Sequence, residues 1–276
     1  MALFPFRASL NASTLFPYEL GIREQIRIAA EAGYDGIEIW MKDLRQYAED
    51  GGSPRELGEY AAELGIEISN AISFIPWADD DAGVRLKGVG QADEELALLA
   101  ELGCPSFAAP PFGSVDRATL DDVAERYAGL AEQCRSFGVV PILEFWGRAK
   151  KLSRLSEAVY VAMQSRVRDV SVLLDPFHMY TGGSSLEDLT YLSAERIGIV
   201  HANDYPDRPP RETIGDADRL FPGDGIAPSA EFAAKLASAG YRGFMSLELF
   251  RPHYGGRSAL ETAKHGLVKL KNAYAV

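Results

Sequence analysis

The feature of this sequence that most limits its fold is a repeated unit. In each copy, an amphipathic segment rich in Ala and Glu leads through a glycine into a short run rich in Ile, Val and Phe. Glycine readily adopts the left-handed conformation that ends a helix, and β-branched residues favour a strand. Each unit therefore predicts a helix followed by a strand. The unit appears as "IRIAAEAGYDGIEIW", "YAAELGIEIS", "LALLAELGCPSFAAP", "LAEQCRSFGVVPILEFW", "LSAERIGIVHANDY" and "AAKLASAGYRGFMSLELF".

Eight segments have the composition of strands, and segments with the 3.6-residue period of helices separate them. Strands joined by helical crossovers run parallel, and eight such units in 276 residues are typical of a (β/α)8 TIM barrel. We therefore predict an α/β protein with a single TIM-barrel domain over residues 1–276, closed by a C-terminal helix from Ser258 towards Tyr274. The predicted strands are 5–13, 34–40, 65–73, 104–110, 139–145, 170–177, 197–204 and 244–250.

A doubly wound open sheet is the alternative architecture for alternating helices and strands. Members of that class that bind dinucleotides carry a G-x-G-x-x-G fingerprint after the first strand. The corresponding segment here, "LNASTLFPYELG", lacks it. The barrel is therefore preferred, and no linker or low-complexity segment divides the chain.

Composition argues against several classes of protein. Two cysteines, Cys104 and Cys134, are too few for a disulfide framework and favour a reducing cytoplasm. The start "MALFPFRASL" lacks the apolar core of a signal peptide, and no segment has the roughly 18 apolar residues of a membrane span. A net charge of −12 disfavours nucleic acid, whose binding depends on Lys and Arg. We expect a soluble cytoplasmic protein with neither membrane nor nucleic-acid partner.

Side chains that bind metals stand at the ends of four consecutive predicted strands, the fifth to the eighth. They are Glu144, Asp175, His201 and Glu248, and the active site of a barrel lies at these carboxyl ends. Singly, each has an ordinary structural explanation. Together, three carboxylates on one rim would repel one another, and a divalent cation would remove that conflict. The residues suit Mn²⁺, Mg²⁺, Co²⁺ or Zn²⁺, and His178 would overhang the same opening.

Six motifs give the chain a family resemblance along nearly its whole length. They resemble those of the xylose isomerase-like TIM barrel superfamily of sugar isomerases and epimerases, and most closely the inosose isomerase type of inositol catabolism. The motifs "DADRLFPGDG" and "LELFRPHY" are the most specific, whereas "GIEI" recurs in many members. The full set is "LNASTL", "GYDGIEI", "LEFWG", "LLDPFH", "DADRLFPGDG" and "LELFRPHY".

The resemblance implies roles for individual residues. It makes Glu144, Asp175, His201 and Glu248 the ligands of one divalent metal ion, and Glu144 and Glu248 a pair of acid-base groups on opposite sides of the substrate. The histidine that matches His178 contacts substrate oxygens in relatives.

The same resemblance implies that the arginine of "RLFPG", Arg219, helps to hold substrate oxygens. The loop before it, "YPDRPPRETIGDAD", is longer than in ketose epimerases. Arg208 and Arg211 in this loop are therefore competing candidates for the same role.

The predicted reaction is proton transfer next to a ketone through an enediolate. Such a reaction needs a positive group at the carbonyl oxygen and a base near the carbon, which the metal and one of the two glutamates would supply. The loops after the seventh and eighth predicted strands lack a glycine-rich phosphate cradle. The expected substrate is therefore a small unphosphorylated keto-sugar or keto-inositol.

Three other functions compete with this interpretation. An inosose or dehydroshikimate dehydratase would use the same metal site and the same enediolate. An apurinic endonuclease of the superfamily is a remote alternative, because it needs many histidines and this chain has four. A barrel used only for binding or assembly would not need acidic ligands at four strand ends. Whether the protein forms a homo-oligomer stays open.

Other residues near the strand ends receive weaker predictions. Five aromatic residues are candidates for an apolar wall over the sugar or for ordinary packing. Glu38 and Glu67 lie within predicted strands, so structural roles in the barrel interior are preferred for both, and no function is assigned to His253 or His265. The aromatic candidates are Trp40, Phe74, Trp77, Phe112 and Trp146.

Overall fold

The computed structural model describes residues 3–276 and confirms the predicted TIM barrel. Eight parallel strands pair in chain order, and β8 pairs with β1 to close the sheet. Each of the eight predicted strands contains one of them. The strands are β1 (Arg7–Asn11), β2 (Gly36–Trp40), β3 (Glu67–Ile72), β4 (Ser106–Ala109), β5 (Val140–Glu144), β6 (Val172–Leu174), β7 (Ile197–Ala202) and β8 (Phe244–Leu247).

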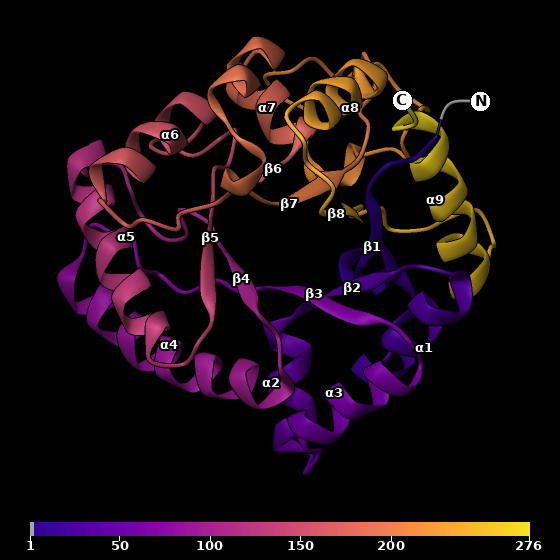
Figure 1. The fold of residues 1–276 in the computed structure, drawn as a ribbon, viewed down its shortest axis with the longest axis horizontal. Helices are drawn as coiled ribbons and strands as arrows, with labels where there is room; N and C mark the ends of the chain where they lie inside the picture. Colours follow the sequence, from indigo (N-terminus) through magenta and orange to yellow (C-terminus); the bar gives the residue numbers. More distant parts are fainter. Residues whose placement is uncertain (1–2) are drawn as a thin grey trace.

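Helices surround the strands as an outer layer (Figure 1). The α-helices are α1 (Ile22–Ala32), α2 (Met41–Glu49), α3 (Pro54–Glu63), α4 (Ala82–Leu102), α5 (Leu120–Arg135), α6 (Leu155–Gln164), α7 (Pro176–Gly182), α8 (Ser229–Ser238) and α9 (Ala259–Ala273). Short 3-10 helices are η1 (Ala12–Tyr18), η2 (Leu186–Tyr191), η3 (Ala194–Arg196) and η4 (Asp216–Asp218).

The helix ends follow the signals read from the sequence. Gly33 ends α1 and Gly103 ends α4 in the left-handed conformation, with φ of 92° and 79°. Their amide N–H groups donate to the last carbonyl groups of the helix, which would otherwise lack partners. Ser258 caps α9 in a capping box with Glu261, so the predicted C-terminal helix begins where expected.

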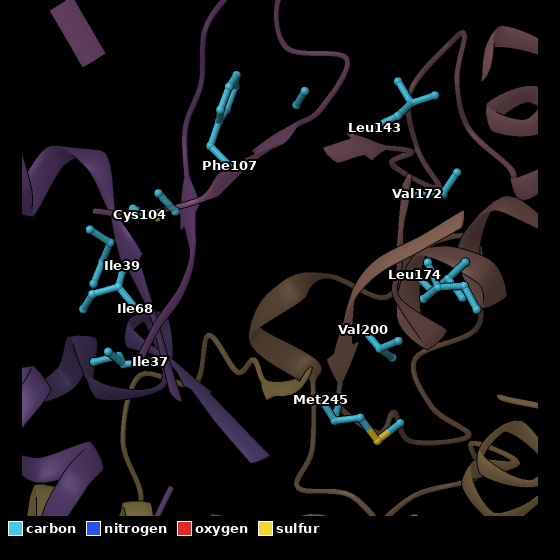
Figure 2. Close-up of a cluster of buried hydrophobic side chains, with 14 of the residues drawn as sticks. Ile37, Ile39, Ile68, Cys104, Phe107, Leu143, Val172, Leu174, Val200 and Met245 are labelled. Carbon is cyan, nitrogen blue, oxygen red and sulfur yellow. The ribbon is translucent and has the colours of Figure 1, made fainter. Parts of the chain in front are cut away.

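Side chains alternate along each strand between the helix layer and the barrel interior. Leu143 of β5 and Val200 of β7 point outward into the large apolar cluster between strands and helices (Figure 2). Their neighbours Ile142 and Ile199 belong to a separate, smaller cluster inside the barrel. The residue two positions further along each strand therefore also faces the interior.

The prediction for Glu67 is wrong, because this side chain lies outside the barrel interior. Glu67 is the first residue of β3, at the N-terminal opening of the barrel, where its side chain is 61% exposed. There it accepts hydrogen bonds from both terminal nitrogens of Arg7. Within residues 3–276, no helix is long and apolar enough to cross a membrane. Cys104 and Cys134 are both buried and free.

Candidate active site

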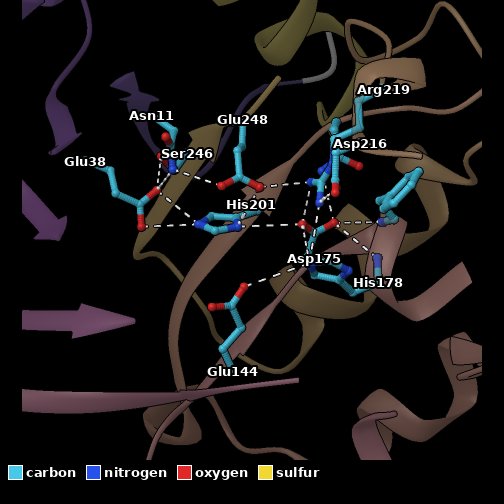
Figure 3. A network of polar contacts seen from close by, with 12 residues as sticks. Asn11, Glu38, Glu144, Asp175, His178, His201, Asp216, Arg219, Ser246 and Glu248 are labelled. Carbon is cyan, nitrogen blue, oxygen red and sulfur yellow. Dashed lines mark hydrogen bonds and ion pairs between the residues drawn. The ribbon is translucent and has the colours of Figure 1, made fainter. Parts of the chain in front are cut away.

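The four side chains that were predicted to bind a metal all point into the carboxyl-terminal mouth of the barrel (Figure 3). Glu144 ends β5, Asp175 directly follows β6, His201 lies in β7 and Glu248 directly follows β8. Asp175, His201 and Glu248 each offer one ligand atom, and these atoms lie within 4.8 Å of one another. Glu144 stands beside this group, with its Oε1 4.0 Å from Nε2 of His178.

The sequence after β6 orients Asp175. The residue caps α7, and its Oδ1 accepts hydrogen bonds from the backbone N–H of Phe177 at 2.7 Å and the side-chain amide of Asn203 at 3.0 Å. The other oxygen, Oδ2, faces the centre of the site and accepts from Arg219 at 2.6 Å. Because Oδ1 is used in the helix cap, Oδ2 is the oxygen that Asp175 presents to the centre of the site.

His201 is held by one nitrogen and presents the other to the acidic groups. Its Nε2 lies 3.0 Å from an oxygen of Glu38, and its Nδ1 lies 3.1 Å from Glu248 and 3.6 Å from Asp175. Nδ1 is buried and makes no hydrogen bond with any described residue. Burial alone would lower the pKa of His201, but the charges of Glu248 and Glu38 outweigh it and raise that pKa well above its usual value.

Glu38 is the centre of a polar network beneath the site. Besides His201, its two oxygens accept hydrogen bonds from the side chains of Asn11, Asn70 and Ser246 at 2.7–2.8 Å. Burial would raise the pKa of Glu38, but the charge of His201 and these hydrogen bonds lower it instead. Glu38 is therefore ionised, as a carboxylate that orients a metal-binding histidine would be.

Asn11 connects this network to Glu248. Its Oδ1 accepts hydrogen bonds from the backbone N–H of Ser13 and the indole N–H of Trp40, so the other end of the amide is its nitrogen. That nitrogen donates to Glu38 at 2.7 Å and to Glu248 at 3.1 Å. One amide thus fixes both carboxylates.

Glu144 and Glu248 have raised pKa values. Burial raises the pKa of Glu144 to about 8. The charge of His201 opposes this shift, and the charges of Glu248 and Asp175 add to it. Burial also raises the pKa of Glu248, although His201 and Arg219 oppose it. A buried carboxyl group such as Glu144, which gains or loses its proton near neutral pH, suits proton transfer.

Of the three candidate arginines, only Arg219 reaches the site. Its side chain is 1% exposed, and Nη1 donates to Asp175 at 2.6 Å and to Glu248 at 2.9 Å. Asp216 holds the other side of the guanidinium. Arg208 and Arg211 are exposed on the surface.

His178, on the first turn of α7, lies beside the acidic groups. Its Nε2 is 3.9 Å from Asp175 and 4.0 Å from Glu144. Burial lowers the pKa of His178 to about 4, although the charge of Asp175 opposes the shift. The imidazole is therefore neutral at pH 7 and can donate one hydrogen bond and accept another.

A cavity of about 670 Å³ opens over these groups, and aromatic residues line one side of it. Trp40, Phe74 and Trp146 from the predicted set line the cavity, and the ring of Phe112 contacts Phe74. Trp77 belongs to the core instead, where its ring packs against Tyr127 and its N–H donates to the carbonyl of Pro110.

The two remaining histidines lie away from the acidic groups. His265 is on α9 and packs against Phe221, and His253 is an exposed loop residue.

The arrangement fits a divalent cation. Asp175 and Glu248 direct carboxylate oxygens at the same point as a buried imidazole nitrogen that lacks a hydrogen bond. Arg219 and protonated His201 offset the negative charge in the metal-free protein, and a metal would replace the proton on Nδ1. Glu144 is close enough to join as a fourth ligand only if its side chain turns.

Comparison with known families identifies the fold. The family model described as "Xylose isomerase-like TIM barrel" matches residues 26–273. The chain belongs to the xylose isomerase-like TIM barrel family. The family resemblance seen in the sequence motifs is thereby confirmed.

Relatives within the xylose isomerase-like family differ in activity. The inosose isomerase of Halalkalibacterium halodurans is 32% identical over 249 residues, which cover 86% of this chain and 87% of that protein. The 3-dehydroshikimate dehydratase of Pseudomonas aeruginosa is 28% identical over 90% of this chain, but the match spans 39% of the dehydratase. Family membership therefore supports an enzyme and does not select one reaction.

Solved structures of the family share the fold. The structure of the IOLI protein with a binding zinc atom superposes with a TM-score of 0.87, at 24% identity, over 98% of this chain and 99% of that one. The D-psicose 3-epimerase of Clostridium cellulolyticum H10, solved with D-tagatose, gives a TM-score of 0.76 at 19% identity, over 98% of this chain and 100% of that one.

Sequence reasoning missed several members of this xylose isomerase-like site. Phe250 follows Glu248 by two positions, and that alternation could have placed it on the cavity wall. Asp216 precedes Arg219 by three residues, a spacing that brings two side chains of a helical turn together. The contact between Glu38 and His201 crosses the barrel from β2 to β7 and has no local signal.

Proposed function

We propose that this protein is a divalent-metal-dependent isomerase or epimerase of an unphosphorylated keto-sugar or keto-inositol, working through an enediolate. The observation that carries the proposal is the convergence of Asp175 and His201 with Glu248, which lines one cavity together with Glu144. These four residues would hold one Mn²⁺, Mg²⁺, Co²⁺ or Zn²⁺ ion. The zinc atom of the IOLI structure makes zinc the first metal to test.

The two glutamates provide the acid and the base of this proposal. Glu144 and Glu248 lie on opposite sides of His201 (Figure 3). The ionised member of the pair removes a proton from the carbon next to the ketone, and the protonated member returns one to the opposite face or to the adjacent carbon. When bound, the metal supplies positive charge that offsets the negative charge developing on the carbonyl oxygen.

His178 and Arg219 orient the substrate in this scheme. The neutral imidazole of His178 faces the cavity and can donate a hydrogen bond to a substrate oxygen. The guanidinium of Arg219 also lines the cavity, where it can donate to a hydroxyl while Asp216 holds its far side. Fixed donors of this kind lower the entropic cost of reaching the reactive geometry.

Metal analysis followed by solvent-deuterium exchange tests the proposal. The purified protein should carry or bind one divalent metal ion, and with it an inosose or ketose should exchange the hydrogen next to its ketone with D2O. Glu248→Gln should abolish exchange. Glu67→Gln changes an exposed carboxylate at the other end of the barrel and should leave exchange unchanged. A protein that exchanges no member of an inosose and ketose panel would contradict the proposal.

Dehydration is the second candidate, favoured by the similarity to 3-dehydroshikimate dehydratases along 90% of this chain. The same carboxylates would remove the proton, and the enediolate would then expel a neighbouring hydroxyl. A dehydratase forms a conjugated ketone that absorbs in the near ultraviolet. Appearance of this absorbance with an inosose or a dehydroshikimate would favour the dehydratase over the isomerase.

A further inference from the structure

Six aromatic rings at the mouth of the barrel form two connected groups. Phe16, Trp40 and Phe250 form an inner group, with ring centroids 4.9–6.5 Å apart. A rim group consists of Phe74, Phe112 and Trp146, with centroids 5.3–6.5 Å apart. Trp40 and Phe74 join the two groups at 5.4 Å.

The inner group adjoins the acidic groups of the site. Trp40 donates its indole N–H to Asn11, which in turn donates to Glu248, and the guanidinium of Arg219 lies 5.3 Å from the ring of Phe250. Trp40 and Phe250 of the inner group therefore line the cavity beside the acidic groups.

The rim group extends the aromatic surface outward on the loops after β3, β4 and β5. Phe112 is 39% exposed, although rings of this size are normally buried. The cavity continues past these rings, because its lining runs from Glu248 and Arg219 to residues 111 and 113–116 and to Lys150. Its volume of about 670 Å³ lies in the middle of the roughly 300–1,000 Å³ of pockets for drug-sized ligands, larger than one sugar ring fills.

We infer that the substrate carries a second ring, joined to the keto ring, whose flat apolar face stacks on Phe74 and Trp146 where Phe112 packs against them. This inference rests on the proposed function and specifies its substrate class. The C–H face of a second sugar and the face of an aryl group share the required chemistry. Lys150 lines the same cavity and would meet polar atoms at the edge of that ring.

Lys150 is the residue at this end whose charge is available to a ligand. Lys150 is exposed and forms no ion pair with any residue of the described range 3–276. Arg148, two residues earlier, is already used, because it donates to the carbonyls of Arg211, Glu212 and Ile214 and ties that loop to the cavity edge. Recognition of the second ring therefore falls to the rim aromatics, with Lys150 and Asp116 as the charged residues at the cavity edge.

Binding of three probes to the metal-loaded protein tests the inference. Methyl β-D-glucoside presents one ring, phenyl β-D-glucoside adds an aryl group, and cellobiose adds a sugar. Calorimetry and ligand-observed NMR should give about tenfold tighter binding for at least one two-ring probe than for the methyl glucoside. The preferred two-ring probe distinguishes an aryl from a sugar partner. Equal affinities for the three probes, or no binding of either two-ring probe, would overturn the inference.

Variants separate stacking from general effects on the protein. Phe112→Ala removes an exposed ring and should abolish the preference for two rings while leaving the affinity for methyl β-D-glucoside unchanged. Trp146→Ala should reduce the same preference. Trp77→Phe alters a core tryptophan outside the cavity and should keep it. Equal weakening of all three probes by Phe112→Ala would contradict a second-ring site. If the protein prefers two-ring probes but exchanges no deuterium, the proposed reaction is rejected and the second-ring site is retained.

Discussion

Two buried glutamates of the barrel interior have pKa shifts in opposite directions, and their hydrogen-bond partners explain the difference. Glu38 accepts hydrogen bonds from Asn11, Asn70 and Ser246 and contacts His201, so its carboxylate stays ionised. Glu144 has no comparable set of donors, and burial raises its pKa to about 8. Glu38 therefore acts as a fixed negative charge, whereas Glu144 can gain or lose a proton near neutral pH.

Glu38→Gln should weaken metal binding by roughly 10- to 100-fold, because the carboxylate that orients His201 is lost while the proposed ligands remain. Competition with a chromophoric chelator measures the affinity. Ser246→Ala removes one donor to Glu38 but keeps the contact with His201, so its affinity should stay close to that of the wild type. Wild-type affinity in Glu38→Gln would show that the orientation of His201 does not depend on this carboxylate.

Glu144→Gln should change how stability depends on pH in the metal-free protein. Below a pH of about 4.5 the carboxyl group of Glu144 is protonated in both the folded and the unfolded state, and it then resembles glutamine. Between about 4.5 and 8 the unfolded chain loses this proton and the folded protein retains it, because the folded pKa is about 8. Unfolding of the wild type therefore becomes relatively easier as pH rises through this range.

Denaturant unfolding in the presence of a chelator measures this effect. The free energy of unfolding of Glu144→Gln, minus that of the wild type, should increase from pH 4.5 to 8 and then level off. Glu67→Gln is the control, because this exposed carboxylate is ion-paired with Arg7 and has a lowered pKa. A difference for Glu144→Gln that stays constant over the range would contradict the raised pKa.

At the scale of helices and strands, local signals were sufficient to predict the alternation of elements. Glycine caps such as Gly33 and Gly103 mark where a helix ends, and the apolar run that follows marks the strand. Glu67 was misplaced because composition does not say where along the barrel axis a strand begins. Trp77 was grouped with the cavity aromatics because the sequence does not say which face of a loop packs inward.

Close approach between helices gives the fold a further requirement that the sequence does not reveal. A Cβ on Gly58 of α3 would collide with the backbone carbonyl of Leu102 at the end of α4. A Cβ on Gly129, in α5, would meet nothing within 4 Å. The two helical glycines therefore have opposite reasons for being present.

Gly58→Ala and Gly129→Ala should change stability in opposite directions. Alanine stabilises the interior of a helix by about 0.5–1 kcal/mol relative to glycine, so Gly129→Ala should raise the free energy of unfolding by this amount. At Gly58 the collision should cost about 1–3 kcal/mol, more than this gain. Denaturant unfolding of both variants measures the difference. Stabilisation by Gly58→Ala would mean that the end of α4 shifts at little energetic cost to accommodate the added Cβ.

At the scale of the whole molecule, strand order decides which parts of the candidate site can be predicted. Glu144, Asp175, His201 and Glu248 were predicted to lie together because consecutive strands are neighbours on the rim. The position of Arg219 instead of Arg208 or Arg211 depends on the path of a long loop, which has no periodic signal. The Glu38 contact spans the barrel and requires the closed sheet.

A metal ion bound at the mouth of the barrel should stabilise the entire fold, because its proposed ligands come from separate strands. Strands β6, β7 and β8 supply the ligands of the proposed ion, so unfolding any of them would release the ion. A ligand that binds only the folded state stabilises it by about 2.7 kcal/mol at roughly 100 times its dissociation constant. Zinc or manganese should therefore raise the melting temperature, and chelation should reverse the increase.

Two histidine variants determine whether this stabilisation comes from the barrel mouth. His201→Ala removes the proposed nitrogen ligand and should abolish the metal-dependent rise in melting temperature. His265→Ala removes an imidazole from α9, in contact with Phe221 and outside the acidic group, and should leave the rise intact. His201 is buried, so a rise caused by adventitious binding at surface histidines would survive in His201→Ala. A rise that survives in His201→Ala would place the stabilising ion elsewhere and remove the basis for the proposed chemistry.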